Sequence, residues 1–549
     1  MSKRSRRRAG DSWQPTLDRV EQVKKLSQTP PTSSRGYQNQ LKNGKLWVRD
    51  RIALLVDPGT FSEIGSVTGT PTFSPGSNNL ESFVPTNFLS GLARIDSRRV
   101  AVAADDFTIR AGHADGALYQ KAAYIESLAQ SLYIPLVRLV DGSSGGGSVA
   151  VYRDLGYTYV PPSTGAGWIT MIESLSIIPV CGIILGPAVG LGAAKVSTTH
   201  FSVICSDVGS LFNAGPVVVE RAGIEEGLTN ADLGGPGVVC TNGAIDNFAG
   251  TEAECFALVR RFLSYLPSSV LDLPPRVPYT ALPPAEREAR AAALDTAVPT
   301  NRSRGYAIRP IIRNLFDDGS FLELGPAWGS PAIVGFARLR GHAVSVVAFD
   351  VESPSLGALT AAAAAKLKRH LELASLFGLP VVQLVDMPGF AIGSRAEREG
   401  TMRAGVACIR AYYAASVPIF SVILRKVYGI AGAFLVDHKL PHYRLAWPSG
   451  EWGSLPLDGG IEAAFAHDLK LARQTGGQAG HDALLAKLQA EFNVLADPIR
   501  TAMSFNIEEI VRPGLTRNVL AEWTELMYGT VLKQRLRQVR ARVQQTARM

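Results

Sequence analysis

An internal repeat limits the possible folds of this chain more than any other feature of its sequence. Matching residues recur at offsets between 239 and 260, and these offsets differ only by amounts that loops of unequal length explain. The matching pairs are residues 57–61 with 317–321, Gly91 with Gly335, Lys121 with Lys366, Asp141 with Asp386, and Gly190 with Gly429. A period of this length indicates a duplicated domain and not a solenoid of short repeats.

Both repeats show the same order of segments: strand, strand, helix, strand, Gly-rich loop, helix, strand, loop, helix. The clearest strand is the apolar run in residues 379–390, which ends at Asp386 and a Pro-Gly corner. Residues 416–434 repeat the design, with an apolar strand, a turn at Tyr428 and Gly429, and a helix start. Strands that are apolar throughout, alternating with helices, predict an α/β fold with a largely parallel sheet. Ligand sites of such sheets lie at the carboxyl ends of the strands.

The length of 549 residues also favours two domains, because one hydrophobic core rarely serves so long a chain. We predict a basic N-terminal tail over residues 1–35 and a first domain over 36–266. A linker over 267–303 follows, since six prolines fall within residues 267–284. The second domain is predicted over 304–549.

The basic charge of the chain is concentrated at its ends. The formal net charge is +8, but residues 1–9 carry five Lys and Arg side chains and residues 530–549 carry six, with no acidic residue in either range. The residues between them therefore have a formal charge of −3. A nucleic-acid-binding groove through the body is not expected.

The cysteines and the apolar segments of the sequence bear on the cellular compartment of the protein. The five cysteines form no CxxC pair, which argues against a zinc ribbon and a disulfide framework. Residues 177–194 are uncharged and mostly apolar, but two prolines and four glycines favour a strand, turn and helix over a membrane span. The first ten residues contain no apolar segment of a secretory signal. We expect a cytoplasmic protein, with the mitochondrial matrix as the alternative and no membrane partner.

Eight sequence blocks in both repeats, from about residue 40 onwards, carry a family resemblance. They are GKLWVRDRIALLVDPGTFSEIG, LVDGSSGGG, LGPAVGLGAA, SLFNAGP, LGGPG, DDGSFLELG, LVDMPGFAIGSRAEREG and SVILRKVYGIAGAFL. Together and in this order they resemble the carboxyltransferase (β) subunits of biotin-dependent acyl-CoA carboxylases, of which the propionyl-CoA and methylcrotonyl-CoA carboxylases are the nearest types.

This resemblance implies two tandem crotonase-like (ClpP-type) β/α domains, the first on the acyl-CoA side and the second on the biotin side. Each active site would lie between the first domain of one subunit and the second domain of another, within a homo-hexamer. The reaction implied is carboxyl transfer from carboxybiotin to the α-carbon, or vinylogous carbon, of an acyl-CoA. The chain has no Met-Lys-Met biotin attachment sequence, so biotin is expected on a biotin carboxylase/biotin carrier (α) partner. No metal is required.

The chemistry requires donors for two oxyanions, the thioester enolate and the ureido oxygen of biotin. Backbone N–H groups at the start of helices supply such donors without a titrating side chain. By resemblance, the acyl-CoA oxyanion hole lies at Gly190 and Leu191, and the biotin hole at Gly429 and Ile430. Further substrate or biotin contacts are implied at Gly145, Gly146, Gly147, Gly186, Tyr428, Ala431, Ala433, Gly389 and Phe390.

Three departures from the family pattern bear on this site. Leu191 and Ile430 replace the second glycine of a Gly-Gly pair, and the loop at residues 142–148 lacks the family's arginine. Ala433 stands where propionyl-type subunits have Asp, which suggests an acyl pocket for a longer or branched chain. Two other functions remain open: a decarboxylase or transcarboxylase subunit, and a non-catalytic scaffold paralogue.

Two matched pairs of charged residues have alternative interpretations. Asp141 and Asp386 are expected to cap the ends of their strands or turns. Lys121 and Lys366 are expected to be solvated helix residues, with a contact to a CoA phosphate as the alternative.

Overall fold

The computed structural model describes residues 12–113, 119–142, 152–153, 156–158, 165–437 and 443–546. The chain divides into two compact units, which we describe separately. The first comprises Met1–Val239 and Phe248–Arg260, and the second comprises Cys240–Asn247 and Arg261–Met549.

The first unit is built on a mixed β-sheet in which β4 is antiparallel to β1 and β5, and β5 to β8 are parallel. The strands in sheet order are β1 (Ser62–Glu63), β4 (Phe88–Ile95), β5 (Arg98–Asp105), β6 (Leu136–Gly142), β7 (Val180–Val189), β8 (Phe201–Cys205) and β10 (Asn247–Ala249), with β9 (Ser210–Phe212) also paired to β7. A separate hairpin joins β2 (Gly69–Phe73) and β3 (Leu80–Pro85). The helices up to β10 are α1 (Gln14–Gln28), α2 (Arg35–Lys42), α3 (Val48–Leu55), α4 (Tyr119–Ser131), α6 (Gly165–Ser174), α7 (Leu191–Ser197), α8 (Pro216–Arg221), α9 (Asn230–Gly234) and α10 (Pro236–Val239).

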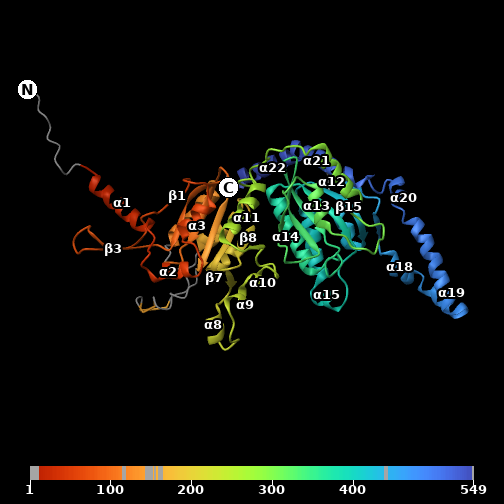
Figure 1. The fold of residues 1–549 in the computed structure, drawn as a ribbon, viewed down its shortest axis with the longest axis horizontal. Coiled ribbons are helices and arrows are strands. Elements are labelled where there is room, and N and C mark those ends of the chain that lie inside the picture. Colours follow the sequence, from red (N-terminus) through yellow and green to blue (C-terminus); the bar gives the residue numbers. More distant parts are fainter. Residues whose placement is uncertain are drawn as a thin grey trace, which may run out of the picture. The chain divides into compact units, whose positions relative to one another are not determined.

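The second unit repeats this sheet, and Figure 1 shows α13 and α14 beside its strands. Its strands in sheet order are β11 (Leu322–Leu324), β12 (Ala332–Leu339), β13 (His342–Phe349), β14 (Val381–Met387), β15 (Ile419–Tyr428), β16 (Tyr443–Ala446) and β18 (Glu509–Ile510), with β17 (Glu451–Gly453) also paired to β15. The helices after β10 are α11 (Glu252–Tyr265), α12 (Pro284–Asp295), α13 (Ile308–Leu315), α14 (Ala361–Phe377), α15 (Ser394–Arg398), α16 (Thr401–Ala414), α17 (Gly429–Leu435), α18 (Leu457–Ala464), α19 (Ala466–Leu495), α20 (Pro498–Met503), α21 (Thr516–Gly529) and α22 (Val531–Thr546).

The predicted duplication and the α/β fold class are confirmed. Each sheet has eight strands. Seven of them follow the same order in both sheets, and the eighth is a short strand, β9 or β17, paired with the strand that precedes the candidate site. Local details recur as well. The Asp57 carboxylate accepts the N–H groups of the turn between β4 and β5, and Asp317 does the same for the turn between β12 and β13.

The matched glycines Gly91 and Gly335 occupy equivalent strand positions at which a side chain would clash. A Cβ atom on Gly91 would lie 2.4 Å from the Ser62 carbonyl oxygen, and one on Gly335 would lie 2.1 Å from that of Leu322. In both repeats, the short edge strand (β1 or β11) can therefore pair with its neighbour (β4 or β12) because the glycine of that neighbour has no side chain.

The parallel strands form the apolar centre of each unit, as their sequences predict. Every residue of β6 and of β14 is buried, and β15 is buried except at Lys426. The predicted strand, turn and helix in residues 177–194 is confirmed by β7 and α7. No helix within the described ranges combines the length and apolar character that a membrane crossing requires.

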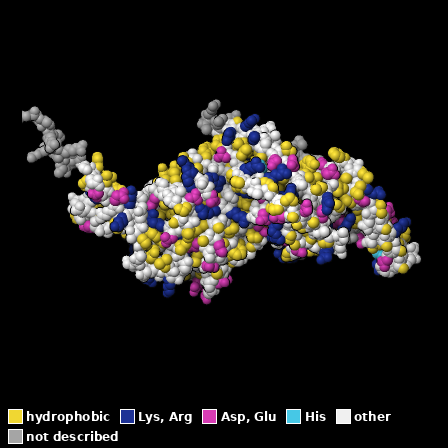
Figure 2. Space-filling view, turned by 45° about the horizontal axis from the view of Figure 1, so that its top comes forward, with side chains coloured by type: hydrophobic (Ala, Val, Ile, Leu, Met, Phe, Trp, Pro, Cys, Tyr) yellow, Lys and Arg dark blue, Asp and Glu magenta, His cyan; other side chains and the backbone are white. Residues whose placement is uncertain are grey.

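The structure also bears on the predicted linker and on the predicted charge distribution. The region predicted as a linker, residues 267–303, contains helix α12, whose last residue Asp295 pairs with Arg512. Figure 2 shows basic and acidic side chains interspersed over the visible face, in line with the small net charge of the body. The assignment of one domain to acyl-CoA and the other to biotin stays a prediction.

Candidate active site

The candidate residues of each repeat follow parallel strands at one edge of the sheet. In the first repeat β6 and β7 are parallel and pair up to Gly142 and Ala188. In the second repeat β14 and β15 pair in the same way up to Met387 and Val427. The loops after these strands therefore begin side by side within each unit, as expected for a ligand site of an α/β sheet.

In the first repeat, Gly190 joins β7 to α7 with φ 57° and ψ −113°, a conformation that favours glycine. The Ala194 N–H donates to the Gly190 carbonyl oxygen at 3.0 Å and closes the first turn of α7. The Leu191 N–H precedes that turn, so it has no partner within the helix. A Cβ atom on Gly190 would meet no atom of the described residues within 4 Å, so they leave the space beside this turn open.

The second repeat has a comparable turn, with a glycine at positive φ between a buried strand and a helix. Gly429 opens α17 with φ 59°, directly after Tyr428, which is buried. Among the atoms of the described residues, a Cβ atom on Gly429 would meet the Ser454 carbonyl oxygen alone, at 3.6 Å. The Ile430 side chain is 63 % exposed, so its added bulk extends into solvent and leaves its N–H in place.

The structure brings most of the other predicted contact residues of the second repeat to this edge. Gly389 and Phe390 follow the neighbouring strand β14, and Phe390 forms a β-bridge with Leu359. On α17, Ala431 is buried and Ala433 is exposed. These residues, with Tyr428, Gly429 and Ile430, thus occupy two adjacent strand ends.

The predicted contacts of the first repeat are described only in part. Gly145, Gly146 and Gly147 lie outside the described residues. Gly186 is buried in β7, where a Cβ atom would lie 2.0 Å from Asp141 Oδ1 and 2.6 Å from Lys45 Nζ. The absence of a side chain at Gly186 therefore makes room for a buried ion pair beneath the Gly190 turn.

That ion pair belongs to a network that sequence reasoning missed. Asp141 accepts from Lys45 Nζ and Arg51 Nη1, each at 2.7 Å, and Arg51 also binds Glu252 at 2.7 Å. All four side chains are buried. The prediction that Asp141 caps a strand end is wrong, because its carboxylate neutralises two cations from the N-terminal segment.

Asp386 has a comparable role in the second repeat. Its carboxylate accepts from Arg425 Nε at 3.0 Å and from the Tyr306 hydroxyl at 2.8 Å, and all three side chains are buried. Partners 39 and 80 residues away along the chain leave no local sequence signal. In each repeat, a buried carboxylate with hydrogen-bond and ion-pair partners thus lies next to the strand ends of the candidate site.

Asp105, at the end of β5, is a buried carboxyl group with a perturbed pKa. Burial raises the pKa of Asp105 to about 6, although Lys195 and the Asp141 N–H favour its charged form. The folded protein therefore binds a proton more tightly than the unfolded chain. This contribution favours folding below about pH 4 and is lost as the pH rises from about 4 to about 6.

We accordingly expect Asp105→Asn to stabilise the protein at pH 7.5 by up to about 3 kcal/mol, because the variant buries no charge. The gain should fall to about half at pH 5. Urea unfolding of the variant and the wild type at both pH values measures it. A difference that does not change with pH would contradict the assignment.

The two matched lysines are also buried, so the expectation that they are solvated is wrong. Burial lowers the pKa of Lys121 and of Lys366 to about 8. The Lys121 ammonium donates to the Gly65 carbonyl oxygen at 3.1 Å. An Arg–Glu pair lies near each lysine: Arg49–Glu63 at 2.9 Å and Arg309–Glu323 at 2.7 Å. A contact to a CoA phosphate remains untested.

Comparison with known proteins identifies the family. Residues 39–541 match the carboxyl transferase domain family. The chain is 30 % identical over 490 residues to the mitochondrial propionyl-CoA carboxylase β chain of Sus scrofa, covering 88 % of this chain and 85 % of that protein. It is 29 % identical to the propionyl-CoA carboxylase carboxyltransferase subunit of Haloferax mediterranei, covering 88 % of this chain and 90 % of that one.

Solved structures agree on the fold. The crystal structure of transcarboxylase 12S superposes with a TM-score of 0.80 and 24 % identity, covering 95 % of this chain and 97 % of that one. The predicted tandem crotonase-like architecture is thereby confirmed. No group of three His, Cys, Asp or Glu side chains suited to a metal ion occurs among the described residues. The chain belongs to the carboxyl transferase domain family and is a biotin-dependent carboxyltransferase of the acyl-CoA carboxylase and transcarboxylase group.

Proposed function

We propose that this chain is the carboxyltransferase subunit of an acyl-CoA carboxylase and stabilises two oxyanions with backbone N–H groups. The observation that carries the proposal is the repeated unit of buried strand, glycine at positive φ and helix start, with φ 57° at Gly190 and 59° at Gly429. Preorganised N–H donors at such turns stabilise developing negative charge without reorganisation.

In the first repeat, the N–H groups at Gly190 and Leu191 hold the thioester oxygen of the acyl-CoA. Removal of the α-proton, for which biotin itself would serve as the base, leaves negative charge on that oxygen, and the two donors lower the energy of the enolate. The buried Asp141 network beneath β7 fixes the turn, since strand and network are in contact at Gly186.

In the second repeat, the N–H groups at Gly429 and Ile430 would hold the ureido oxygen of biotin, carried by a partner subunit. Carboxybiotin supplies the carboxyl group when it is bound there. These residues fit that ligand, because the donors are backbone groups, a Cβ atom on Gly429 would make no contact with a described residue closer than 3.6 Å, and the Ile430 side chain is exposed. The partner and a homo-hexameric core are part of this proposal.

Reverse transfer by the purified chain tests the function. Malonyl-, methylmalonyl-, methylglutaconyl- and longer carboxyacyl-CoAs are offered with free biotin as the acceptor, and the decarboxylated acyl-CoA is followed. We expect one substrate class to react selectively. Silence across the panel, with a known β subunit active in parallel, would instead favour a non-catalytic scaffold.

Ala433 provides a prediction about substrate choice. It is exposed on α17 and replaces the Asp of propionyl-type subunits. We expect Ala433→Asp to shift the ratio of kcat/KM for short over longer acyl-CoAs about tenfold towards the short ones, because an added carboxylate penalises an apolar chain. An unchanged preference in the same panel would show that Ala433 does not line the acyl pocket.

A further inference from the structure

A buried arginine of β6, Arg138, holds the C-terminal end of α7, the helix that begins at Leu191. The Arg138 side chain is 1 % exposed. Its Nη1 donates to the Lys195 carbonyl oxygen at 2.7 Å and to the Thr198 carbonyl oxygen at 2.8 Å. The last carbonyl groups of a helix have no partner within the helix. Arg138 therefore supplies donors at the end of α7 that lies opposite Leu191.

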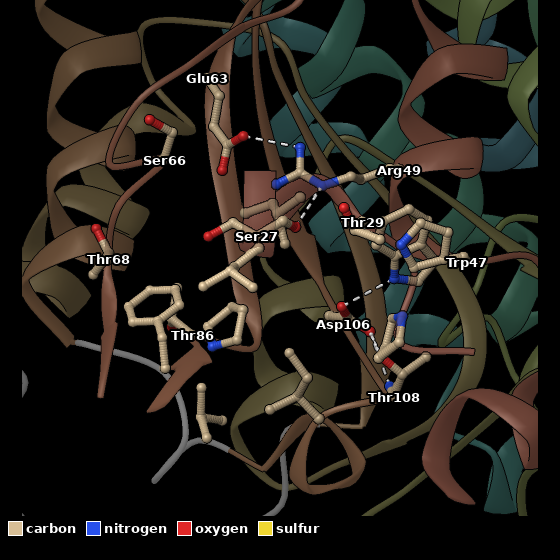
Figure 3. Close-up of a pocket in the computed structure, with 18 of the residues that line it drawn as sticks. Ser27, Thr29, Trp47, Arg49, Glu63, Ser66, Thr68, Thr86, Asp106 and Thr108 are labelled. Atoms are coloured by element: carbon tan, nitrogen blue, oxygen red, sulfur yellow. Dashed lines mark hydrogen bonds and ion pairs between the residues drawn. The ribbon is translucent and has the colours of Figure 1, made fainter. Parts of the chain in front are cut away.

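The other edge of this guanidinium is fixed by Glu126 of α4, which is also buried. Nε and Nη2 of Arg138 donate to the two carboxylate oxygens at 2.9 and 2.8 Å, so the pair is bidentate. A different Arg–Glu pair of the first unit, Arg49–Glu63, lies partly exposed at the wall of a cavity. Figure 3 shows that Arg49 reaches Ser27 and not the end of a helix of the candidate site. Glu126 thus orients Arg138 so that its remaining N–H groups face α7.

The second repeat holds its equivalent helix, α17, with an uncharged side chain. Gln383 of β14 matches Arg138 at an offset of 245, the offset that relates Asp386 to Asp141. Its amide Nε2 donates at 2.9 Å to the carbonyl oxygen of Leu435, the last residue of α17. Two different side chains at one strand position therefore make the same kind of contact.

The neighbouring strands match this difference in side-chain length. Gly182 of β7 lies opposite Arg138. Ser421 of β15 lies opposite Gln383, and its hydroxyl also donates to the end of α17, at 2.9 Å. A Cβ atom on Gly182 would lie 3.1 Å from the methyl carbon of Thr199, directly after α7. The first repeat thus combines a glycine with a long donor, and the second combines a hydroxyl with a shorter donor.

We propose that Arg138 is a positioning residue for carboxyl transfer, which holds the C-terminal end of α7 and thereby fixes the direction of the Leu191 N–H at the other end. Helix α7 has seven residues. It is therefore only about 10 Å long, so a shift of one end also moves the other. A misplacement of about 1 Å at a reacting group can cost about 100-fold in rate. This inference rests on the proposed function, because it concerns the same oxyanion hole.

A matched pair of variants separates positioning from stability. Both carry Glu126→Met, so that no unpaired carboxylate is buried, together with either Arg138→Met or Arg138→Gln. Methionine and glutamine are similar in size, but only glutamine has an N–H donor, as Gln383 has in the second repeat. Both variants lack the ion pair, so they differ mainly in the contact to α7.

In reverse transfer, we expect the variant with Arg138→Met to have a kcat about 10-fold below that of the wild type. The KM for the carboxyacyl-CoA should stay within about twofold, because the lost interaction is one made in the transition state. The variant with Arg138→Gln should have a kcat at least about threefold above that of the Arg138→Met variant, the effect of one hydrogen bond. Rates are compared at a temperature at which circular dichroism shows both variants to be folded.

Hydrogen exchange gives a second measurement that does not depend on activity. The amides of a peptide spanning residues 189–199, followed by mass spectrometry, should exchange faster in the Arg138→Met variant than in the wild type. The Arg138→Gln variant should lie between them.

Arg338→Met is the control, because Arg338 is another buried arginine that donates to backbone carbonyl groups. Its acceptors are Ser264 on α11, at 2.8 Å, and Gly341 in the turn after β12, at 3.0 Å. Its kcat should equal that of the wild type.

The proposal is overturned if the Arg138→Met and Arg138→Gln variants have the same kcat, if α7 exchanges at the wild-type rate in the Arg138→Met variant, or if the control lowers kcat to the same degree. A wild-type chain that transfers no carboxyl group would contradict the proposed function. The exchange of α7 would then decide by itself whether Arg138 positions this helix.

Discussion

Replacing Leu191 with proline is expected to slow carboxyl transfer by about 10²- to 10³-fold, the usual effect of removing one oxyanion-hole donor. Proline lacks an N–H group and is well tolerated at the first position of a helix, which Leu191 occupies in α7. The substitution therefore removes the proposed donor with little disturbance of the fold. Reverse-transfer rates at saturating substrate measure the effect.

Leu191→Ala is the matched control, because it shortens the same side chain and keeps the N–H group. We expect it to retain activity within a few-fold of the wild type, and both variants to show the wild-type melting temperature. Equal activity of Leu191→Pro and Leu191→Ala would show that this N–H group does not take part in the reaction.

Replacing Asp141 with asparagine is expected to lower the free energy of unfolding by about 3–5 kcal/mol. The change keeps the shape of the side chain but leaves Lys45 and Arg51 buried with one carboxylate, Glu252, between them. An uncompensated buried cation is far more costly than an exposed one. Urea unfolding at pH 7.5 measures the loss.

The control for this change is Glu399→Gln on the surface. Glu399 pairs with Arg395 at 2.7 Å, but the Arg395 side chain is 91 % exposed, so losing the pair should change stability by less than about 1 kcal/mol. A value for Asp141→Asn as small as that of the control would mean that water or another group compensates the two cations.

The parts of the fold that sequence predicts are those with local signals. Apolar runs such as β14 and β15 identify buried parallel strands, and a glycine or proline after each run marks the turn. The duplication follows from matched turns, including those at Asp57 and Asp317. These features need no knowledge of distant contacts.

The parts that sequence does not predict depend on contacts across long chain separations. Arg51 meets Asp141 and Glu252 from 90 and 201 residues away. Lysine in a helix is usually solvated, so the sequence around Lys121 and Lys366 predicts exposed side chains. Their burial becomes apparent only in the tertiary structure. Likewise, α19 contains Gly476, Gly477 and Gly480, which disfavour a helix locally, and its backbone departs from helical geometry at Gly477.

The candidate site divides in the same way. The positions of Gly190 and Gly429 at strand ends follow from sequence, because glycine after an apolar run is a local signal. The role of Gly186 does not, since its neighbour Asp141 becomes visible only when β6 and β7 are paired.

The decisive measurement for the mechanism is the reverse-transfer rate of Ile430→Pro against Ile430→Ala, with free biotin as the acceptor. Ile430 occupies the second position of α17, where proline is also compatible with a helix start. If one oxyanion hole per repeat carries the chemistry, the proline variant is at least about 100-fold slower than the alanine variant. Equal rates for the two variants would contradict the use of the second repeat's N–H groups in carboxyl transfer.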